Sequence, residues 1–245
     1  LLILRINGDV MLLEVKNLDA GYGYLQILRS VSLNIDKGEY VCIIGPNGAG
    51  KSTTMKSIIG LIAPMGGTVV FNGEDITGMS ASQITTKGIS FVSEEMNLFV
   101  NMSVQENLYM GAYTIKDKKI QKNRLDFVFS LFPRLAERKA QLAGTMSGGE
   151  RKMLAIGRGM MSDPKLLLVD EPSFGLAPQL VANVFESLDV LKSQGVTILL
   201  VEQNVTKTLA VTDRGYILEN GKIGLKGKSR ELADNPHVRK VFLGV

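Results

Sequence analysis

Apolar and polar residues follow one another along this chain with two different periods, which predict strands and helices in turn. Apolar and polar residues alternate in the segments 12–18 and 31–35, which is the spacing of a strand. The strand at 12–18 is expected at a sheet edge. Further apolar runs predict strands at 41–44, 68–71, 89–92, 166–169 and 197–201. Helices are predicted at 51–61 and 179–192, and this succession of strands and helices favours a parallel sheet.

The middle and the end of the chain depart from this succession. Between residues 104 and 143, charge is dense and strand signals are absent, which predicts a helical subdomain, about 95–160, inserted into an α/β core. Near the C-terminus, the runs 216–218 and 222–224 flank Asn220-Gly221. This pair supplies the positive φ angles of a tight turn, so the two runs predict a hairpin.

Length and composition limit the classes of function. A chain of 245 residues can bury a full core, and we predict one domain over residues 11–245. Residues 1–10 are expected to be an N-terminal extension, because Met11 is followed at once by the first strand. The single cysteine, Cys42, permits no internal disulfide and lies in an apolar run typical of a buried residue.

Charge and hydropathy argue against two kinds of partner. The net charge is +4, but the basic residues are scattered and few aromatics accompany them, which argues against nucleic-acid binding. No apolar run reaches the roughly 18–20 residues of a membrane span, so membrane contact is expected only through a partner.

A glycine-rich loop connects the predicted strand at 41–44 to the helix at 51–61. Its sequence, Gly45-Pro46-Asn47-Gly48-Ala49-Gly50-Lys51-Ser52, matches the phosphate-loop pattern in the required place between strand and helix. Glycines let backbone N–H groups turn toward phosphates, and the helix N-terminus adds positive potential. Lys51 is expected to reach the outer phosphates, and the Ser52 hydroxyl suits Mg²⁺. A glycine turn that merely caps a helix is the alternative.

Two adjacent carboxylates, Asp170 and Glu171, follow the apolar run 166–169. Buried strands seldom end in neighbouring acids without a cation nearby. Asp170 is therefore a candidate magnesium ligand, directly or through water, and Glu171 is a candidate general base for an attacking water. An exposed acidic turn is the alternative for this segment taken alone, but it explains the segment poorly beside a phosphate loop.

A third motif, Met146-Ser147-Gly148-Gly149-Glu150-Arg151, precedes a helix predicted at 153–161. A Ser-Gly-Gly sequence at a helix start offers backbone N–H groups and a hydroxyl to an anion. Taken alone, the motif is an ordinary helix cap, and its combination with the other two motifs changes that interpretation.

Together, the three motifs resemble those of the ATPases of the ABC transporter family in their order and spacing. The resemblance extends from about Leu12 to the C-terminus. The resemblance implies a P-loop NTPase (RecA-like) parallel-sheet core with an antiparallel β subdomain and an inserted helical subdomain. It also implies that two subunits sandwich two ATP molecules head to tail, with Ser147, Gly148 and Gly149 contacting the γ-phosphate on the opposite subunit. The residues it assigns to the nucleotide in this subunit are Tyr22, which stacks on adenine, and Asn47, Gly48, Gly50, Lys51, Ser52 and Thr53.

Three runs are similar to the ATPases of branched-chain amino acid importers (LivF-type): Thr145 to Glu150, Asp170 to Pro178 and Val201 to Asn204. Importers of urea, amides or other small solutes share much of this pattern and are the alternative. An ABC-type ATPase outside transport is a further alternative, although this chain lacks the long coiled-coil insertions of repair members.

Three positions depart from the wider family. Glu94 stands where a glutamine usually contacts magnesium and the permease, and Ala177 stands where an aspartate is usual. Gln203 replaces the switch histidine, since the only histidine of the chain is His237; a glutamine can bond a phosphate but cannot carry a proton. The expected catalytic residues are Lys51, Glu171 and Gln203, and the expected magnesium ligands are Ser52, Glu94 and Asp170.

The resemblance also implies partners and a location. The chain is expected to hydrolyse ATP with Mg²⁺ on the cytoplasmic face of the cell membrane, held there by transmembrane permease subunits. A heterodimer with a second ATPase subunit is expected, because the importer branch commonly uses two different ones, and a homodimer is the alternative. The apolar residues between Glu94 and Met102 predict a groove for a permease helix, with core packing as the alternative for Leu98 and Phe99.

Overall fold

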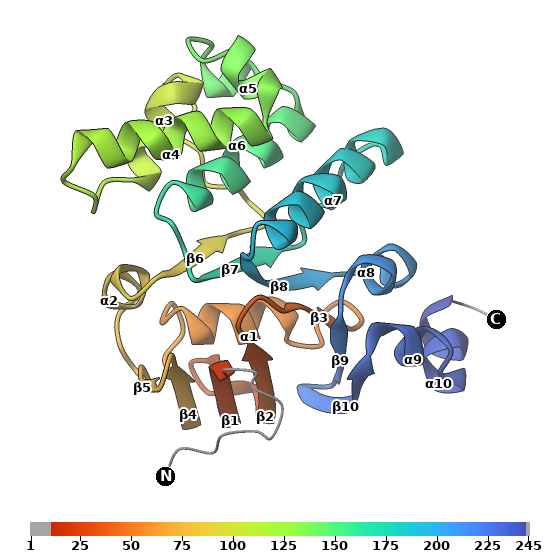
Figure 1. The fold of residues 1–245 in the computed structure, drawn as a ribbon. Helices are drawn as coiled ribbons and strands as arrows, with labels where there is room; N and C mark the ends of the chain where they lie inside the picture. The colour runs from red at the N-terminus through yellow and green to blue at the C-terminus, as the bar shows by residue number, and fades with distance from the viewer. Residues whose placement is uncertain (1–10, 244–245) are drawn as a thin grey trace. The chain divides into compact units, whose positions relative to one another are not determined.

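Two units make up the part of the chain that the computed structural model describes, residues 11–243 (Figure 1). Unit 1 comprises Leu1–Lys87 and Thr197–Val245, and unit 2 comprises Gly88–Val196. The extension expected at residues 1–10 lies outside the described residues. Among residues 11–243, no helix is both long enough and apolar enough to cross a membrane.

An antiparallel sheet begins unit 1. Its strands are β1 (Met11–Tyr22), β2 (Leu25–Asp36), β4 (Gly66–Phe71) and β5 (Glu74–Asp75), in the order β2-β1-β4-β5. The expectation that residues 12–18 lie at a sheet edge is wrong, because β1 pairs with β2 on one side and with β4 on the other. Alternating burial shows only that one face of a strand is covered, and interior strands of an antiparallel sheet share that pattern.

The strand before the glycine-rich loop, β3 (Tyr40–Ile44), lies between two parallel neighbours, β8 (Thr197–Glu202) and β9 (Arg214–Glu219). Every residue of β3 and β8 is buried, which accounts for their almost uninterrupted apolar sequences. The predicted hairpin is confirmed: β10 (Lys222–Lys228) pairs antiparallel with β9. Asn220 and Gly221 form its turn with φ angles of 49° and 77°, which this residue pair adopts readily.

The helices of unit 1 are short: α1 (Lys51–Ile58), α2 (Ala81–Thr86), α8 (Val205–Val211), α9 (Ser229–Ala233), α10 (Pro236–Val238) and the π-helical turn η2 (Arg239–Leu243). The helix predicted over 51–61 ends earlier, at Ile58, and Gly60 follows with a φ of 75°. Helix α2 was not predicted from the sequence, although Ser80 and Gln83 form a capping box that signals its start.

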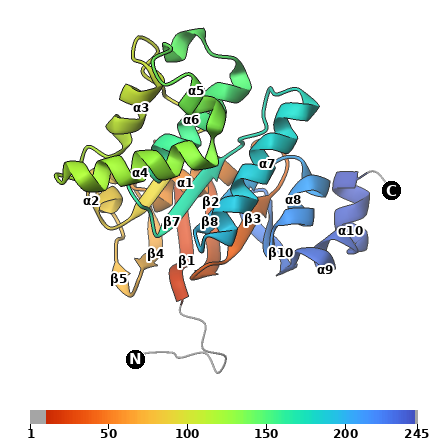
Figure 2. The same ribbon diagram turned by 45° about the horizontal axis from the view of Figure 1, so that its top comes forward.

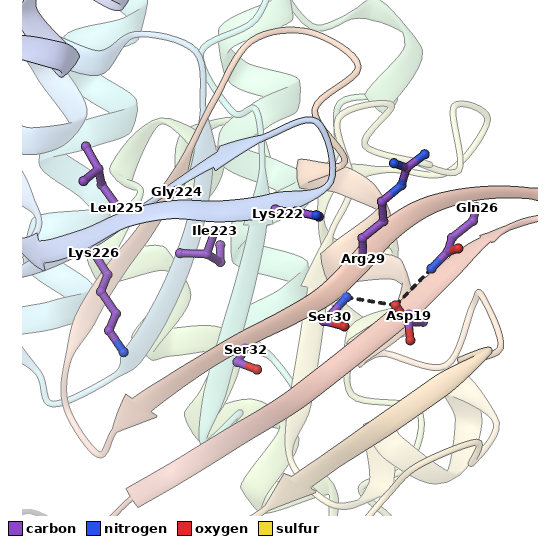
Figure 3. Close-up of a pocket in the computed structure, with 10 residues that line it drawn as sticks. All are labelled: Asp19, Gln26, Arg29, Ser30, Ser32, Lys222, Ile223, Gly224, Leu225 and Lys226. Atoms are coloured by element: carbon purple, nitrogen blue, oxygen red, sulfur yellow. Dashed lines mark hydrogen bonds between the residues drawn. The ribbon is translucent and has the colours of Figure 1, made fainter.

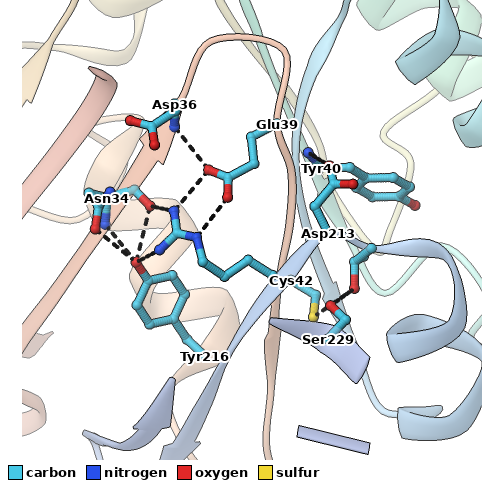
Figure 4. A network of polar contacts seen from close by, with 10 residues as sticks. Asn34, Asp36, Glu39, Tyr40, Cys42, Asp213, Tyr216 and Ser229 are labelled. Carbon is cyan, nitrogen blue, oxygen red and sulfur yellow. Dashed lines mark hydrogen bonds and ion pairs between the residues drawn. The ribbon is translucent and has the colours of Figure 1, made fainter. Parts of the chain in front are cut away.

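A polar network joins the two sheets of unit 1 (Figure 4). The Arg214 guanidinium donates to both carboxylate oxygens of Glu39, at 2.7 and 2.8 Å, and to the Tyr216 hydroxyl at 2.6 Å. Tyr216 in turn bonds Asn34 of β2, so a residue pair from β9 reaches across to the antiparallel sheet. The hydrogen bonds to Glu39 raise the pKa of Arg214, although its burial acts in the opposite direction.

Unit 2 combines two parallel strands with a cluster of helices. β6 (Ile89–Val92) pairs with β7 (Leu166–Asp170), and both agree closely with their predicted ranges. The helical elements are α3 (Val104–Gly111), α4 (Lys118–Leu131), α5 (Pro133–Glu137), η1 (Ala143–Thr145), α6 (Gly148–Met160) and α7 (Pro178–Ser193).

Helix α6 is the centre of that cluster. Figures 1 and 2 show α3, α4 and α5 gathered around it, and each of them packs against it. Gly157 permits the close approach of α4, because a Cβ there would lie 2.9 Å from Val128. The helix was predicted to start at residue 153, but it already begins at Gly148, because Ser147 caps it.

Candidate functional site

The glycine-rich loop leaves β3 and enters α1 in the conformation expected of an anion-binding loop. Gly48 and Gly50 have φ angles of 79° and 106°, which only glycine adopts without strain. Gly50 is the N-cap of α1, and no side chain caps the helix there, so its first N–H groups face the loop. Lys51 is 5% exposed, and its Nζ donates to the carbonyls of Gly45 at 3.0 Å and Pro46 at 3.3 Å.

The hairpin turn between β9 and β10 supports the same loop from behind. Gly221 N donates to Ala49 O at 3.0 Å, and Gly221 O accepts from Arg29 N at 2.8 Å. A Cβ on Gly221 would lie 1.9 Å from Ile27 O, so only glycine fits between the loop and β2. The Asn220-Gly221 pair predicts the hairpin, but nothing in its sequence indicates this second role of Gly221.

The other residues predicted in unit 1 lie at strand ends or in the first turn of α1. Ile44 pairs with Glu202 in adjacent parallel strands, so Gln203 follows β8 beside the start of the glycine-rich loop. Gln203 N donates to Glu202 Oε2 at 3.1 Å. Tyr22 ends β1 and is 52% exposed, which leaves ring surface that a base could cover. Ser52 and Thr53 lie in the first turn of α1.

In unit 2, both carboxylates at the end of β7 are buried: Asp170, its last residue, is 2% exposed, and Glu171, which follows it, is 6% exposed. Glu171 has a φ of 44°, a left-handed conformation that is uncommon for a residue other than glycine. Strain of this kind gathers at functional sites, where surrounding contacts hold it in place. Phe174 N donates to Glu171 O at 3.2 Å and closes a turn after the strand.

Glu94 and Glu171 follow adjacent strands, because Val92 of β6 pairs with Val169 of β7. A buried lysine of α6, Lys152, joins the two segments. Its Nζ donates to Glu94 O at 2.7 Å and to Glu171 O at 3.4 Å. Lys152 is not among the residues predicted from the sequence, because a lone lysine in a helix is normally interpreted as a solvated surface residue.

The loop that begins at Glu94 has a second attachment to α6. Met96 and Asn97 are both left-handed, with φ angles of 62° and 45°, and Arg158 donates to each of their carbonyls at 2.7 Å. The guanidinium also lies 5.8 Å from the centre of the Phe99 ring, and burial lowers its pKa. Phe99 and Val100 are 44% and 49% exposed, so the core-packing alternative is wrong for Phe99.

The Ser-Gly-Gly motif forms the start of α6. Ser147 is the N-cap: its N and Oγ donate to Glu150 Oε2, and its Oγ accepts from Glu150 N. Burial raises the pKa of Glu150, but the hydrogen bonds from Ser147 and the charge of Arg138 outweigh it, and the pKa lies below its usual value. The N–H groups of Gly148 and Gly149 belong to the first helical turn, where an anion is favoured.

Magnesium requires oxygen ligands, and the three residues predicted to bind it each offer one oxygen-bearing side chain. The Ser52 hydroxyl lies in unit 1, and the Asp170 and Glu94 carboxylates lie in unit 2. Residues 11–243 contain no group of three or more His, Cys, Asp or Glu side chains that could hold a metal. Mg²⁺ commonly takes one or two protein oxygens together with substrate phosphates and water, and each of these side chains offers an oxygen of that kind.

A separate pocket of unit 1 involves none of the predicted site residues. It has a volume of about 750 Å³ and lies between β2 and β10 (Figure 3). Asp19 in its wall accepts hydrogen bonds from Ser30 N and Gln26 Nε2, at 2.8 and 2.9 Å. The phosphate-loop residues therefore remain the candidate site, and this open groove is not part of it.

Comparison with known proteins places these motifs in a family. The family described as ABC transporter matches residues 28–174. The chain is 47% identical over 223 residues to the high-affinity branched-chain amino acid transport ATP-binding protein BraG of Pseudomonas aeruginosa, covering 91% of this chain and 95% of BraG. It is 38% identical over 235 residues to LivF of Archaeoglobus fulgidus, described as a probable branched-chain amino acid transport ATP-binding protein, covering 96% and 99%.

A solved structure shows the same fold. The ADP conformation of MJ1267, an ATP-binding cassette of an ABC transporter, matches with a TM-score of 0.85 at 28% identity, covering 96% of this chain and 100% of that one. The predicted fold class, a P-loop NTPase core with antiparallel and helical additions, is thereby confirmed. From its phosphate loop, its paired carboxylates and these likenesses, we conclude that the chain belongs to the ABC transporter family as an ATP-hydrolysing subunit.

Proposed function

We propose that this chain hydrolyses ATP to drive the uptake of branched-chain amino acids through a separate transmembrane permease. The observation that carries the proposal is the 47% identity to BraG over almost the full length of both chains. The similarity to LivF supports the same solute class. Urea and amide import is the alternative drawn from the sequence, and a transport assay separates the two.

The test is solute uptake by cells that lack the gene for this chain. Complementation with the parent chain is expected to restore the uptake of labelled leucine, and complementation with Glu171→Gln is not. Labelled urea and acetamide, measured in the same cells, are expected to enter at equal rates with and without the chain. Restored uptake of urea or acetamide with unchanged leucine uptake would contradict the proposed solute.

The proposed roles of the residues follow from their chemistry. The N–H groups of the phosphate loop and the Lys51 ammonium bind the phosphates, and Tyr22 stacks on the adenine ring. Ser52, Asp170 and Glu94 are the proposed magnesium ligands, and the ion would offset the negative charge on the phosphates. Glu171 orients a water and accepts its proton, and Gln203 donates a hydrogen bond to the γ-phosphate.

We further propose that each nucleotide is shared between two subunits, so that Ser147, Gly148 and Gly149 contact the γ-phosphate held by the other. A heterodimer with a second ATPase that carries a switch histidine is the favoured assembly, and a homodimer is the alternative. In the first case one site contains Gln203 and the other contains histidine; in the second, both contain Gln203.

The permease is proposed to bind at the segment Glu94–Met102 and to hold the chain at the cytoplasmic face of the membrane. The support is the exposed apolar surface of Phe99 and Val100 on a loop that Arg158 holds in place. Phe99→Glu is expected to abolish permease binding in co-purification without reducing ATP hydrolysis by the isolated chain. Undiminished permease binding by this variant would contradict the assignment.

A further inference from the structure

A single buried ammonium, that of Lys152, connects two functional segments of unit 2. The side chain comes from α6 and is 3% exposed. Removing a lysine charge from water is costly unless polar groups replace the lost hydration. Here Glu94 O, at 2.7 Å, and Glu171 O, at 3.4 Å, are among the groups that replace it.

Lys152 contacts Glu171 at a point where the backbone has an uncommon conformation. Glu171 has a left-handed φ of 44°, and a residue with a Cβ holds such a conformation only when surrounding contacts determine it. The carbonyl that Lys152 contacts also accepts from Phe174 N. Lys152 therefore acts on the peptide unit that sets the direction in which the Glu171 side chain leaves the strand.

The contact with Glu94 is at the equivalent point of the neighbouring strand. Val92 and Val169 are paired, so Glu94 and Glu171 each lie two residues beyond that pair. One ammonium that donates to both carbonyls fixes the two segments against each other. The same helix begins at Gly148 and is capped by Ser147, five residues before Lys152, so its N-terminal motif is rigidly connected to both.

Helix α6 carries a second cation, Arg158, that also donates to the loop. Its guanidinium bonds Met96 O and Asn97 O, both in the loop, whereas Lys152 bonds the loop and Glu171 O. Loss of Arg158 would thus disturb only the loop, whereas loss of Lys152 would disturb the loop and the backbone of Glu171 together.

We infer that Lys152 is a positioning residue for ATP hydrolysis: its ammonium fixes the backbone of Glu171 against that of Glu94, and so aims the Glu171 carboxylate. The inference rests on the proposed role of Glu171 as general base. A small misplacement of a reacting group can lower a rate by about a hundredfold without loss of binding. Loss of Lys152 is therefore expected to slow turnover, while the phosphate loop of unit 1 continues to bind the nucleotide.

The test compares the full-length parent chain with Lys152→Met, which has a side chain of similar length but no charge or donor. The kcat for ATP is expected to fall on the order of tenfold or more, and the KM for ATP is expected to stay within about threefold. Lys152→Arg, which restores a cation with several donors, is expected to recover part of the lost kcat. Lys122→Met, at an exposed position of α4, is the control for loss of one positive charge and should match the parent.

Rates are expressed per nucleotide site, counted by titration with a fluorescent ATP analogue, so that unfolded protein does not enter the comparison. If Lys152→Met precipitates, Lys152→Gln takes its place with the same expectation, because its side chain is neutral and shorter. A kcat within about twofold of the parent, or a KM that rises as much as kcat falls, would overturn the inference.

Glu171→Gln separates this inference from the function on which it rests. If Glu171→Gln is inactive and Lys152→Met is not impaired, only the positioning role is wrong. If Glu171→Gln keeps most of its activity, the general base itself is misassigned. In the double variant, Lys152→Met is expected to cause no further loss, because the group that it aims is already disabled.

Discussion

Glu171 has two properties that its sequence context does not display, burial and a left-handed backbone. The acidic pair after an apolar run predicts a candidate site, because buried strands seldom end in unpaired acids. It does not predict φ at Glu171, because that angle depends on contacts made by residues far away in the chain. Lys152 is the clearest of these, and a lysine within a helix gives no sign in the sequence that it is buried.

Lys51 and Tyr22 are expected to contribute differently to nucleotide affinity. Lys51→Ala removes the main side-chain charge on the phosphates and should weaken ATP binding strongly. Tyr22→Ala should weaken it less, by about 1–3 kcal/mol, and equally for GTP, because stacking does not read base edges. Calorimetric titration measures the nucleotide affinities of both variants. An unchanged affinity of Tyr22→Ala for ATP would exclude the stacking role of Tyr22.

Cys42 provides a probe of unfolding. Its side chain is fully buried in β3, and burial raises its pKa to about 12. As the only cysteine, it is expected to react with a chromogenic disulfide reagent in urea but not in native protein at pH 8. Equal reaction rates in both conditions would contradict its burial.

The same pKa shift has a consequence for stability at alkaline pH. Below 9.0, the ordinary pKa of a cysteine thiol, both the folded and the unfolded chain carry the proton, and the contribution of the thiol to stability is fully present. Between that value and about 12, the unfolded chain releases the proton while the folded chain retains it, so the free energy of unfolding falls as pH rises. Cys42→Ala is expected to show a smaller alkaline loss in urea denaturation, and an identical loss would contradict this explanation.

At the scale of elements, the sequence predicts best where one local rule applies. Strand β6 and the Asn220-Gly221 hairpin follow from local pattern and turn chemistry, and the structure has them where they were predicted. The edge position of β1 was wrong, because alternation reports one covered face and not the number of neighbouring strands. The start of α6 was placed late, because Gly148 and Gly149 resemble a turn unless the capping box of Ser147 is recognised.

The hairpin turn is expected to matter for nucleotide binding as well as for stability. Gly221→Ala places a Cβ at a φ of 77° and 1.9 Å from Ile27 O. The left-handed backbone costs about 1–2 kcal/mol, and overpacking adds about 1–3 kcal/mol. Because Gly221 N holds Ala49 O of the phosphate loop, ATP affinity should fall too.

Gly73→Ala is the matched control, because Gly73 has a φ of 80° but nothing within 4 Å of the added Cβ. It should show only the backbone cost in urea denaturation and bind ATP like the parent. If both variants bind ATP equally well, the hairpin does not support the loop.

At the scale of the whole molecule, the Ser-Gly-Gly motif is expected to act on a second subunit. Glu171→Gln slows hydrolysis and should trap an ATP-bound dimer, which light scattering detects as a doubled mass. Adding Ser147→Arg should prevent dimerisation, because the larger side chain blocks the approach of a phosphate to the start of α6. A dimer that persists in the double variant would contradict the shared site.

The composition of the purified transporter decides between the two proposed assemblies. The favoured heterodimer requires one copy of this chain and one of a second ATPase, which intact mass spectrometry resolves. Two copies of this chain and no second ATPase would show that the homodimer is the working assembly.

The most direct test of the central claim is the rate of ATP hydrolysis by Glu171→Gln, measured as released phosphate. Glutamine has the size and shape of glutamate but cannot accept the proton of the attacking water. The rate is expected to fall by about 10²–10⁴-fold, with ATP affinity within about twofold of the parent chain. A variant that hydrolyses ATP at more than half of the parent rate would contradict the claim that Glu171 is the base of this ATPase.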